Sequence, residues 1–364
     1  MIYLDAAATT LQKPDAVRLA VLRAMQRCAS VGRGGYGAAM EAAEAVYRCR
    51  QIAAALFGAE AEQVVFTMNA THALNLAVHT LVHPGDEVVI SGFEHNAVWR
   101  PLTAAGANLR IAGRTLFDPD DTLSAFDAAI TARIKAVFCT HVSNVFGYIL
   151  PVEQIAALCR ARGVPFVLDA SQSAGSLPVS LRALGAAFIA MPGHKGLYGP
   201  QGTGILLCGM RPEPLISGGT GSLSRLPVMP EQLPDRAEAG TLNVPGIHGL
   251  AAGLEFVQNT GIEAILRHEQ ALQEQMCRAL EGSGVDVFAG AGQTGVLSVQ
   301  KRGVDCETLA QALADEGIAV RAGLHCAPLA HESAGTLEQG TVRLSFSYFN
   351  TPEEIERCAA VLKK

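Results

Sequence analysis

The sequence is poor in aromatic side chains, which make up 5% of its 364 residues and include one tryptophan. It also has no cluster of five or more Lys or Arg residues, and its 28 basic side chains are outnumbered by 34 acidic ones. The basic surface that would bind a nucleic acid is therefore missing. No uninterrupted apolar run approaches the roughly 20 residues that span a bilayer. Neither nucleic acid nor a membrane is an expected partner.

Cysteine pairs at metal-binding or redox spacing are absent as well. The nine cysteines are scattered and odd in number, and no Cys-x-x-Cys occurs. This pattern argues against a disulfide framework and against a zinc site, so no metal is expected. Met1 leads straight into Ile2 and Tyr3 without a basic and apolar leader. The expected location is therefore the cytoplasm.

What the chain does have is apolar material, 49% of its residues, and enough length for two domains. Short β-branched runs alternate with amphipathic helical patterns, which predicts an α/β fold with a largely parallel sheet. The runs that indicate strands are 64–66, 87–90, 136–139, 166–168, 188–190 and 204–207. After about Val244-Pro245-Gly246 the pattern changes to longer helices, one over 262–280. We therefore expect a large domain over 14–245 and a smaller α+β domain formed by 1–13 and 246–364.

A lysine and an upstream aspartate give the first indication of chemistry. Lys195 lies between His194 and Gly196 in Met191-Pro-Gly-His-Lys-Gly-Leu-Tyr198, and Asp169 ends the apolar run that starts at Val164. A lysine amine can hold the aldehyde of pyridoxal phosphate as a Schiff base, and a buried carboxylate can keep the pyridine nitrogen protonated. The pair therefore predicts a pyridoxal 5'-phosphate enzyme.

Other polar residues follow predicted strands, at the edge of the sheet where ligands bind in such folds. Thr71 comes at a strand-to-helix junction, where free amides favour a phosphate; alternatively it or Asn69 only caps the helix. His95 follows the strand that ends near Ser91 and could stack on the cofactor ring or move protons, or be a packed histidine. Asn144 and Gln172 could donate to the cofactor's phenolic oxygen, or serve as turn residues.

Together with Tyr3-Leu-Asp-Ala-Ala-Ala-Thr-Thr10, these segments closely resemble the class V aminotransferase family of fold-type I pyridoxal phosphate enzymes. Within that family the chain is most similar to the cysteine desulfurases and selenocysteine lyases. The resemblance implies that Lys195 forms the Schiff base, that Asp169 pairs with the pyridine nitrogen and that His95 stacks on the ring. It implies a homodimer too, because in the family a threonine of the neighbouring subunit completes the phosphate site. The residues it implies at the cofactor are Ala70, Thr71, His95, Asn144, Asp169, Gln172, His194, Lys195 and Thr241.

The segment Arg321-Ala-Gly-Leu-His-Cys-Ala-Pro328 resembles the loop that carries the nucleophilic cysteine in the selenocysteine-lyase-like branch. Its cysteine, Cys326, has glycine before it and proline after it, as expected of a loop, whereas most cysteines of the chain are expected to be inert and buried. A free thiol is only partly ionised at neutral pH, so a positive setting would help it react. His325 and Arg321 are the residues expected to provide that setting.

Arg343 lies in an alternating strand pattern and matches the family arginine that clamps the substrate carboxylate; the alternative is an arginine that faces solvent. Asn144 is expected to bind substrate beside it. Two positions depart from the family pattern. Pro192 stands where many relatives have a hydroxyl that helps hold the phosphate, and proline also lacks an amide hydrogen. Leu324 replaces a histidine found beside the cysteine in some relatives.

The predicted function is a pyridoxal phosphate-dependent cysteine desulfurase. It would convert L-cysteine to L-alanine, with Lys195, His95 and Cys326 as catalytic residues, and pass persulfide sulfur from Cys326 to an acceptor protein. L-Selenocysteine is an alternative substrate. Another class V reaction, transamination or β-elimination, would not need Cys326. A non-catalytic binding partner with the same fold is the third alternative.

Overall fold

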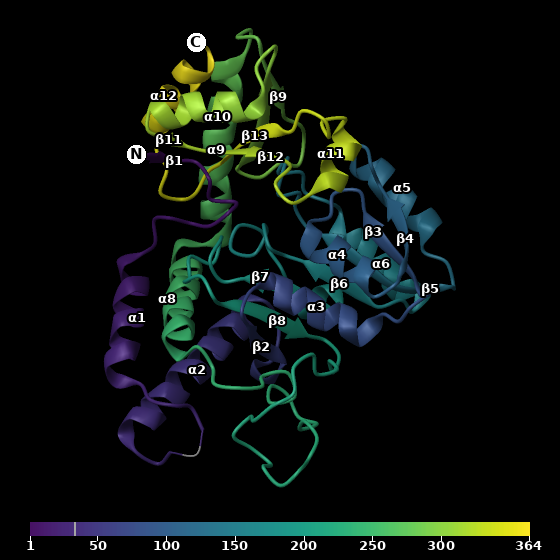
Figure 1. Ribbon diagram of the computed structural model, residues 1–364, viewed down its shortest axis with the longest axis vertical. Helices are drawn as coiled ribbons and strands as arrows, with labels where there is room; N and C mark the ends of the chain where they lie inside the picture. Colours follow the sequence, from purple (N-terminus) through teal and green to yellow (C-terminus); the bar gives the residue numbers. More distant parts are fainter. Residues whose placement is uncertain (33) are drawn as a thin grey trace.

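The computed structural model describes residues 1–32 and 34–364. Its largest element is a seven-stranded sheet with the order β2-β8-β7-β6-β5-β3-β4 (Figure 1). Neighbours from β4 to β7 pair in parallel, whereas β8 runs antiparallel to both β7 and β2. The strands are β2 (Val64–Thr67), β3 (Glu87–Ser91), β4 (Asn108–Ala112), β5 (Ile134–Thr140), β6 (Phe166–Asp169), β7 (Phe188–Pro192) and β8 (Gly204–Cys208).

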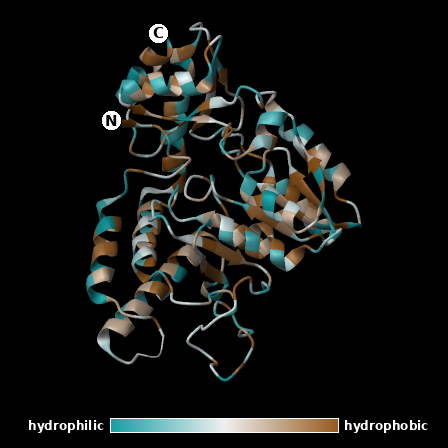
Figure 2. Cartoon of the chain, in the orientation of Figure 1, coloured by the Kyte–Doolittle hydropathy of each residue, from teal (hydrophilic) through white to brown (hydrophobic). Residues whose placement is uncertain are grey.

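Each strand that the sequence indicated for this sheet is present. The edge strand β4 was not predicted, because Asn108 and Arg110 interrupt its apolar pattern. Alternate side chains of the inner strands point to two separate cores. Figure 2 shows these strands as predominantly hydrophobic.

Helices cover both faces of the sheet. One face packs against α2, α6 and α8, and the other against α3 and α4. The helices of this part are α1 (Asp15–Arg27), α2 (Gly37–Leu56), α3 (Ala70–Leu81), α4 (Asn96–Ala104), α5 (Pro119–Ala129), α6 (Val152–Arg162), α7 (Leu181–Leu184) and α8 (Val244–Thr260), with the 3-10 turn η1 (Ala61–Gln63). Their ends follow local rules: Asn69 caps α3, Asp118 caps α5 with Pro119 behind it, and Gly163 ends α6 in the left-handed conformation.

The C-terminal part has its own core around a four-stranded antiparallel sheet of order β12-β13-β10-β9. Its strands are β9 (Val285–Phe288), β10 (Val296–Lys301), β11 (Ile318–Ala319), β12 (Arg321–Gly323) and β13 (Thr341–Ser345). Its helices are α9 (Ile262–Leu280), α10 (Cys306–Asp315), α11 (Pro328–Ala334) and α12 (Pro352–Leu362). The helix predicted over 262–280 is confirmed, and Thr351 and Glu354 form a capping box at the start of α12.

The N-terminal segment belongs with this C-terminal part. β1 (Ile2–Tyr3) pairs with β11, and Asp5 forms a bridge with Ser345. Both chain ends therefore lie in the same region of the molecule (Figure 1). By contrast, α8 packs its buried side chains into the core of the seven-stranded sheet. A division of the chain at residue 245 stays a prediction, and the packing of α8 favours a boundary at Gly261, between α8 and α9.

In the part of the chain that the structure describes, no helix combines the length and hydropathy needed to cross a bilayer.

Candidate active site

Most of the predicted site residues line one cavity at the carboxyl ends of the parallel strands. The cavity is enclosed by side chains and backbone from the loops after β2, β3, β5, β6 and β7. Its lining includes the predicted residues Ala70, Thr71, His95, Asn144, Asp169, Gln172, His194 and Lys195. The sequence analysis had not singled out Thr140 and Ser171, two hydroxyl residues that also line it. Parallel strands bring these loops to one edge of the sheet, although they are far apart in sequence.

Lys195 and Asp169 form the polar centre of this cavity. Burial lowers the pKa of Lys195 to about 8, partly offset by the carboxylate of Asp169. Burial also raises the pKa of Asp169, against the hydrogen bonds from the amide and hydroxyl of Ser171, which lower it. A lysine amine with a depressed pKa is a better nucleophile at neutral pH. The Lys195 loop can approach position 175 closely because this residue is glycine. A Cβ there would lie 2.1 Å from the carbonyl oxygen of Gly196, which is too close.

His95 caps α4, and its Nδ1 accepts the amide hydrogen of Ala97 at 3.0 Å. This contact leaves Nε2 to carry the hydrogen of the neutral ring. Burial lowers the pKa of His95 to about 4, with further lowering from Lys195 and Arg343. His95 is therefore neutral at physiological pH, with the hydrogen on Nε2 available for donation at the cavity.

The start of α3 provides free amide donors. Asn69 accepts the amide of His72 and caps the helix, as the simpler alternative had it. The amides of Ala70 and Thr71, the first two residues of the helix, still have no intrahelical acceptor because of their position. The N-terminus of this helix thus opens into the same cavity as Lys195.

Of the remaining predicted residues, two contact the N-terminal segment and one lies outside the Lys195 cavity. His194 contacts Thr9 through Nδ1 at 3.0 Å, and Gln172 donates to the carbonyl oxygen of Ala7 at 3.0 Å. Pro192 closes β7 and lines the cavity. Thr241 lies in a different cavity, with Thr67 and Asn243.

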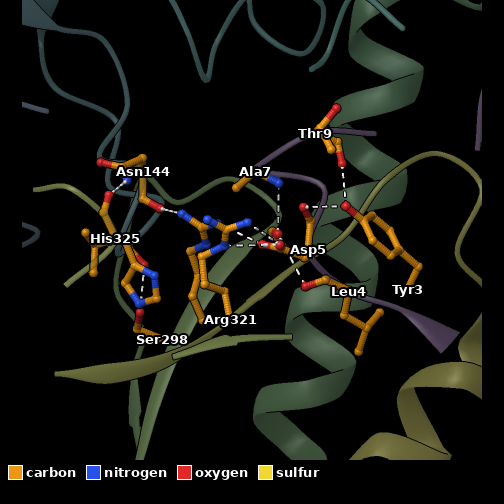
Figure 3. A network of polar contacts seen from close by, with 12 residues as sticks. Tyr3, Leu4, Asp5, Ala7, Thr9, Asn144, Ser298, Arg321 and His325 are labelled. Atoms are coloured by element: carbon orange, nitrogen blue, oxygen red, sulfur yellow. Dashed lines mark hydrogen bonds and ion pairs between the residues drawn. The ribbon is translucent and has the colours of Figure 1, made fainter. Parts of the chain in front are cut away.

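Arg343 is buried, with a side chain 3% exposed, so the solvent-facing alternative is wrong. Its Nη2 donates to Asp5 at 2.9 Å and its Nη1 to the main-chain oxygen of Asn144 at 3.0 Å. Asp5 also pairs with Arg321, the residue opposite Arg343 on β12 (Figure 3). Asp5 was not predicted as a site residue, although it lies within the N-terminal motif that carried the family resemblance.

Cys326 is exposed and follows β12 in the turn before α11. Its carbonyl oxygen accepts the amide of Asn96 at 2.7 Å, which places its backbone beside the residue that follows His95. His325 and Cys326 have φ of 50° and 56°, a left-handed conformation that costs L-residues roughly 1–2 kcal/mol each.

The prediction that His325 provides a positively charged environment for Cys326 is wrong. Its ring is buried and its Nε2 contacts Thr341 at 3.2 Å. Burial, followed by the charge of Arg343, lowers the pKa of His325 to about 2. The ring is therefore neutral, and the cationic side chain of β12 is Arg321, which pairs with Asp5.

Comparison with known proteins agrees with this geometry. The family model for aminotransferase class-V matches residues 2–358, and the chain belongs to that family. A probable cysteine desulfurase of Methanothermobacter thermautotrophicus is 33% identical over 380 residues, which cover 100% of this chain and 94% of that protein. A probable cysteine desulfurase of Xylella fastidiosa is 34% identical, covering 100% and 90%.

Among solved structures, the apo cysteine desulfurase of Thermococcus onnurineus matches with a TM-score of 0.90 and 32% identity, over 100% of this chain and 94% of that one. The cysteine desulfurase CsdA of Escherichia coli, described as the S-sulfonic acid form, matches with a TM-score of 0.87 and 26% identity, over 99% and 93%. These matches confirm the predicted fold of the pyridoxal phosphate enzymes of this class, with a large, mostly parallel sheet and a smaller α+β part.

The residues of the cavity fit pyridoxal phosphate. Lys195 can bind its aldehyde, Asp169 can pair with its pyridine nitrogen, and the free amides of Ala70 and Thr71 can donate to its phosphate oxygens. A buried carboxylate, a lysine with a lowered pKa and a helix N-terminus lie around one cavity, and they can hold the pyridine nitrogen, the aldehyde and the phosphate of this cofactor.

Proposed function

We propose that the protein is a pyridoxal phosphate-dependent cysteine desulfurase that converts L-cysteine to L-alanine and forms a persulfide on Cys326. The observation that carries the proposal is an exposed cysteine whose carbonyl oxygen accepts a 2.7 Å hydrogen bond from Asn96, the residue between His95 and Ala97, which both line the Lys195 cavity. A class V enzyme that performs transamination or β-elimination needs no thiol at that place. The named activity of the relatives supports the same reaction.

The cofactor, when bound, supplies an electron sink for the bonds around the substrate's α-carbon. The protein residues do the rest. We propose that the Lys195 amine would hold the cofactor's aldehyde and, when free, would hold or move a proton at its Nζ, and that neutral His95 would donate a hydrogen bond through Nε2. Asp169 holds the charge on the pyridine nitrogen, and Arg343 binds the substrate carboxylate.

The sulfur step assigned to Cys326 balances without an external oxidant. Its thiolate attacks the sulfur of the substrate, forming a sulfur–sulfur bond while the bond between that sulfur and Cβ breaks. The electron pair left on carbon takes a proton, which gives the methyl group of L-alanine. A thiol acceptor, or an acceptor protein, then removes the outer sulfur and restores Cys326. L-Selenocysteine could follow the same course.

The oligomeric state belongs to the proposal. Thr241 lies outside the Lys195 cavity, as expected if it completes the phosphate site of a neighbouring copy. Helices α1 and α2 leave large apolar side chains exposed, which a second copy would cover. These are Leu19, Leu22, Met25, Met40 and Tyr47. A homodimer is therefore expected, and light scattering after size-exclusion chromatography measures it. The nine cysteines are free, which suits the reducing cytoplasm.

The test is product formation from L-cysteine by purified, cofactor-loaded protein with a thiol reductant. The wild type should release alanine and sulfide in equal amounts. Cys326→Ala should keep the visible absorbance of the lysine-bound cofactor and lose both products. Lys195→Ala should lose that absorbance.

Each rival function predicts a different product or spectrum. Pyruvate in place of alanine would indicate β-elimination, and dependence on a keto acid would indicate transamination. Turnover by Cys326→Ala equal to that of the wild type would refute the persulfide mechanism. Wild-type protein that never acquires the cofactor absorbance would favour a non-catalytic role.

A further inference from the structure

The backbone of the Cys326 segment is held in place from the large part of the molecule. Two consecutive residues, His325 and Cys326, have left-handed φ angles, and neither is glycine. Such a conformation persists only where surrounding contacts fix it. Two hydrogen bonds do so here: the side-chain amide of Asn144 donates to the carbonyl oxygen of His325 at 2.8 Å, and the main-chain amide of Asn96 donates to that of Cys326 at 2.7 Å.

Asn144 has a second contact that joins this segment to Arg343. Its own carbonyl oxygen accepts from Nη1 of Arg343 at 3.0 Å, while its side chain donates to His325. Figure 3 shows Asn144 between His325 and the arginine cluster beside Asp5. Asn144 is only 7% exposed, so water does not readily replace a bond that is lost here.

The His325 side chain fixes the segment from the opposite side. Its ring contacts Thr341 on β13, the strand that carries Arg343. With the ring tied to β13 and the carbonyl oxygen tied to Asn144, rotation about the His325 backbone would break one of the two contacts. The backbone conformation at Cys326 is therefore determined by residues outside the loop.

We propose that Asn144 is a positioning residue for Cys326: its side-chain amide holds the His325 carbonyl and keeps Cys326 in its left-handed conformation, and its main-chain carbonyl ties the same residue to Arg343. The position of the thiol is thereby linked to the arginine that binds the substrate carboxylate. This inference rests on the proposed function for the role of Cys326, whereas the restraint on the loop is a property of the unreacted protein.

Amide hydrogen exchange in the unreacted, cofactor-loaded protein measures the restraint directly. The useful probe is a peptide covering 321–330, because the amide of Ala327 donates to Leu324 within the loop. Asn144→Ala should make this peptide exchange about tenfold faster, the factor that corresponds to one hydrogen bond of ordinary net strength. Asn144→Asp, which keeps the shape but loses the donor, should do the same.

A matched control is Asn108→Ala on β4. Asn108 also donates its side-chain amide to a main-chain oxygen, that of Gly85, at 2.8 Å, but it is the first residue of β4, at the end of the strand opposite to the carboxyl-terminal loops of the sheet. It should leave the exchange of 321–330 unchanged. Asn96→Pro removes the second tether: position 96 is the first residue of α4, and His95 has the extended backbone (φ −74°, ψ 154°) that a following proline requires. It should accelerate exchange as Asn144→Ala does.

Kinetics separate positioning from a role at the cofactor or substrate. A misplaced thiol in Asn144→Ala should lower kcat about tenfold, whereas loss of the cofactor or substrate contact expected of Asn144 would instead lower the cofactor absorbance or raise the KM for L-cysteine. Unchanged exchange of 321–330 in Asn144→Ala would overturn the inference, as would loss of cofactor with normal exchange. Full turnover by Cys326→Ala would instead refute the proposed function and leave the exchange result standing.

Discussion

Asp5 gives a quantitative test of the site, because its one carboxylate carries two ion pairs that differ in burial. Its Oδ1 pairs with Arg343, whose side chain is 3% exposed, and its Oδ2 with Arg321, whose side chain is 51% exposed. Removing one partner of a buried pair costs about 3–5 kcal/mol, because the other charge stays buried without compensation. Exposed pairs are worth about 0.2–1 kcal/mol.

The substitution Asp5→Asn should therefore lower the free energy of unfolding by about 3 kcal/mol, nearly all of it through Arg343. Loss of the carboxylate also leaves two guanidinium groups directly opposite each other on β12 and β13, which is unfavourable. Urea unfolding followed by circular dichroism measures the change. For a slope of about 3 kcal/mol per M, the midpoint should fall by about 1 M.

Double-mutant cycles with Arg343→Met and Arg321→Met then separate the two pairs. The coupling energy of Asp5 with Arg343 should be about 2 kcal/mol or more, and that with Arg321 below about 1 kcal/mol. Equal coupling energies would refute the reasoning from burial. So would an Asp5→Asn protein within about 0.5 kcal/mol of the wild type, which is the effect of an ordinary surface substitution.

Three further predictions follow from buried titratable groups. Burial lowers the pKa of three histidines below the value in the unfolded chain. Their contribution to stability is therefore complete above about pH 6.5 and is lost as the pH falls, by about 1 kcal/mol for each histidine at pH 5.5. A free energy of unfolding that stays constant from pH 7 to 5.5 in urea titrations would contradict this. Those residues are His141 (about 4), His325 (about 2) and His331 (about 4). Burial raises the pKa of Glu94 to about 8, so its buried carboxyl lowers the free energy of unfolding increasingly as the pH rises above 4.5. Glu94→Gln keeps the acceptor for Ser91 and Thr140 and should be more stable than the wild type at pH 8, with the difference vanishing toward pH 4.5. A difference that does not change with pH would show that the charge of Glu94 is not its cause. Asp169→Asn should keep the fold by circular dichroism but lose most L-cysteine turnover in the cofactor-loaded protein, because the carboxylate at the pyridine nitrogen is gone, and undiminished turnover would contradict that role.

Local pattern was sufficient for the elements and for the centre of the site. The apolar runs that end at Ile90, Cys139 and Leu168 became the inner strands β3, β5 and β6, since a strand buried on both faces needs a continuous apolar segment. Because such strands are parallel, polar residues just after them must meet at one edge. Lys195 and Asp169 could therefore be predicted to share a cavity without any knowledge of distances.

The local sequence pattern could not predict the contacts that determine the protonation and the orientation of the site residues. Arg343 is buried because Asp5, from the other end of the chain, neutralises it across a bridge to β13. The edge strand β4 was missed because it has no continuous apolar run: Leu109 and Ile111 alternate with Asn108 and Arg110. The packing of α8 against the large sheet likewise depends on which faces meet, and the helical pattern alone does not specify that.

The sequence by itself thus determined the family and predicted the cofactor and the residues that can carry its chemistry, because motif residues and strand periods are local properties of the chain. The tertiary structure alone decided how those residues are set. His325 neighbours Cys326 in sequence, yet its ring turns into the core and is neutral, while Asn144 and Asn96 fix the cysteine from other elements. Burial and hydrogen-bond partners set protonation and direction, and both depend on contacts between residues that are distant in the sequence.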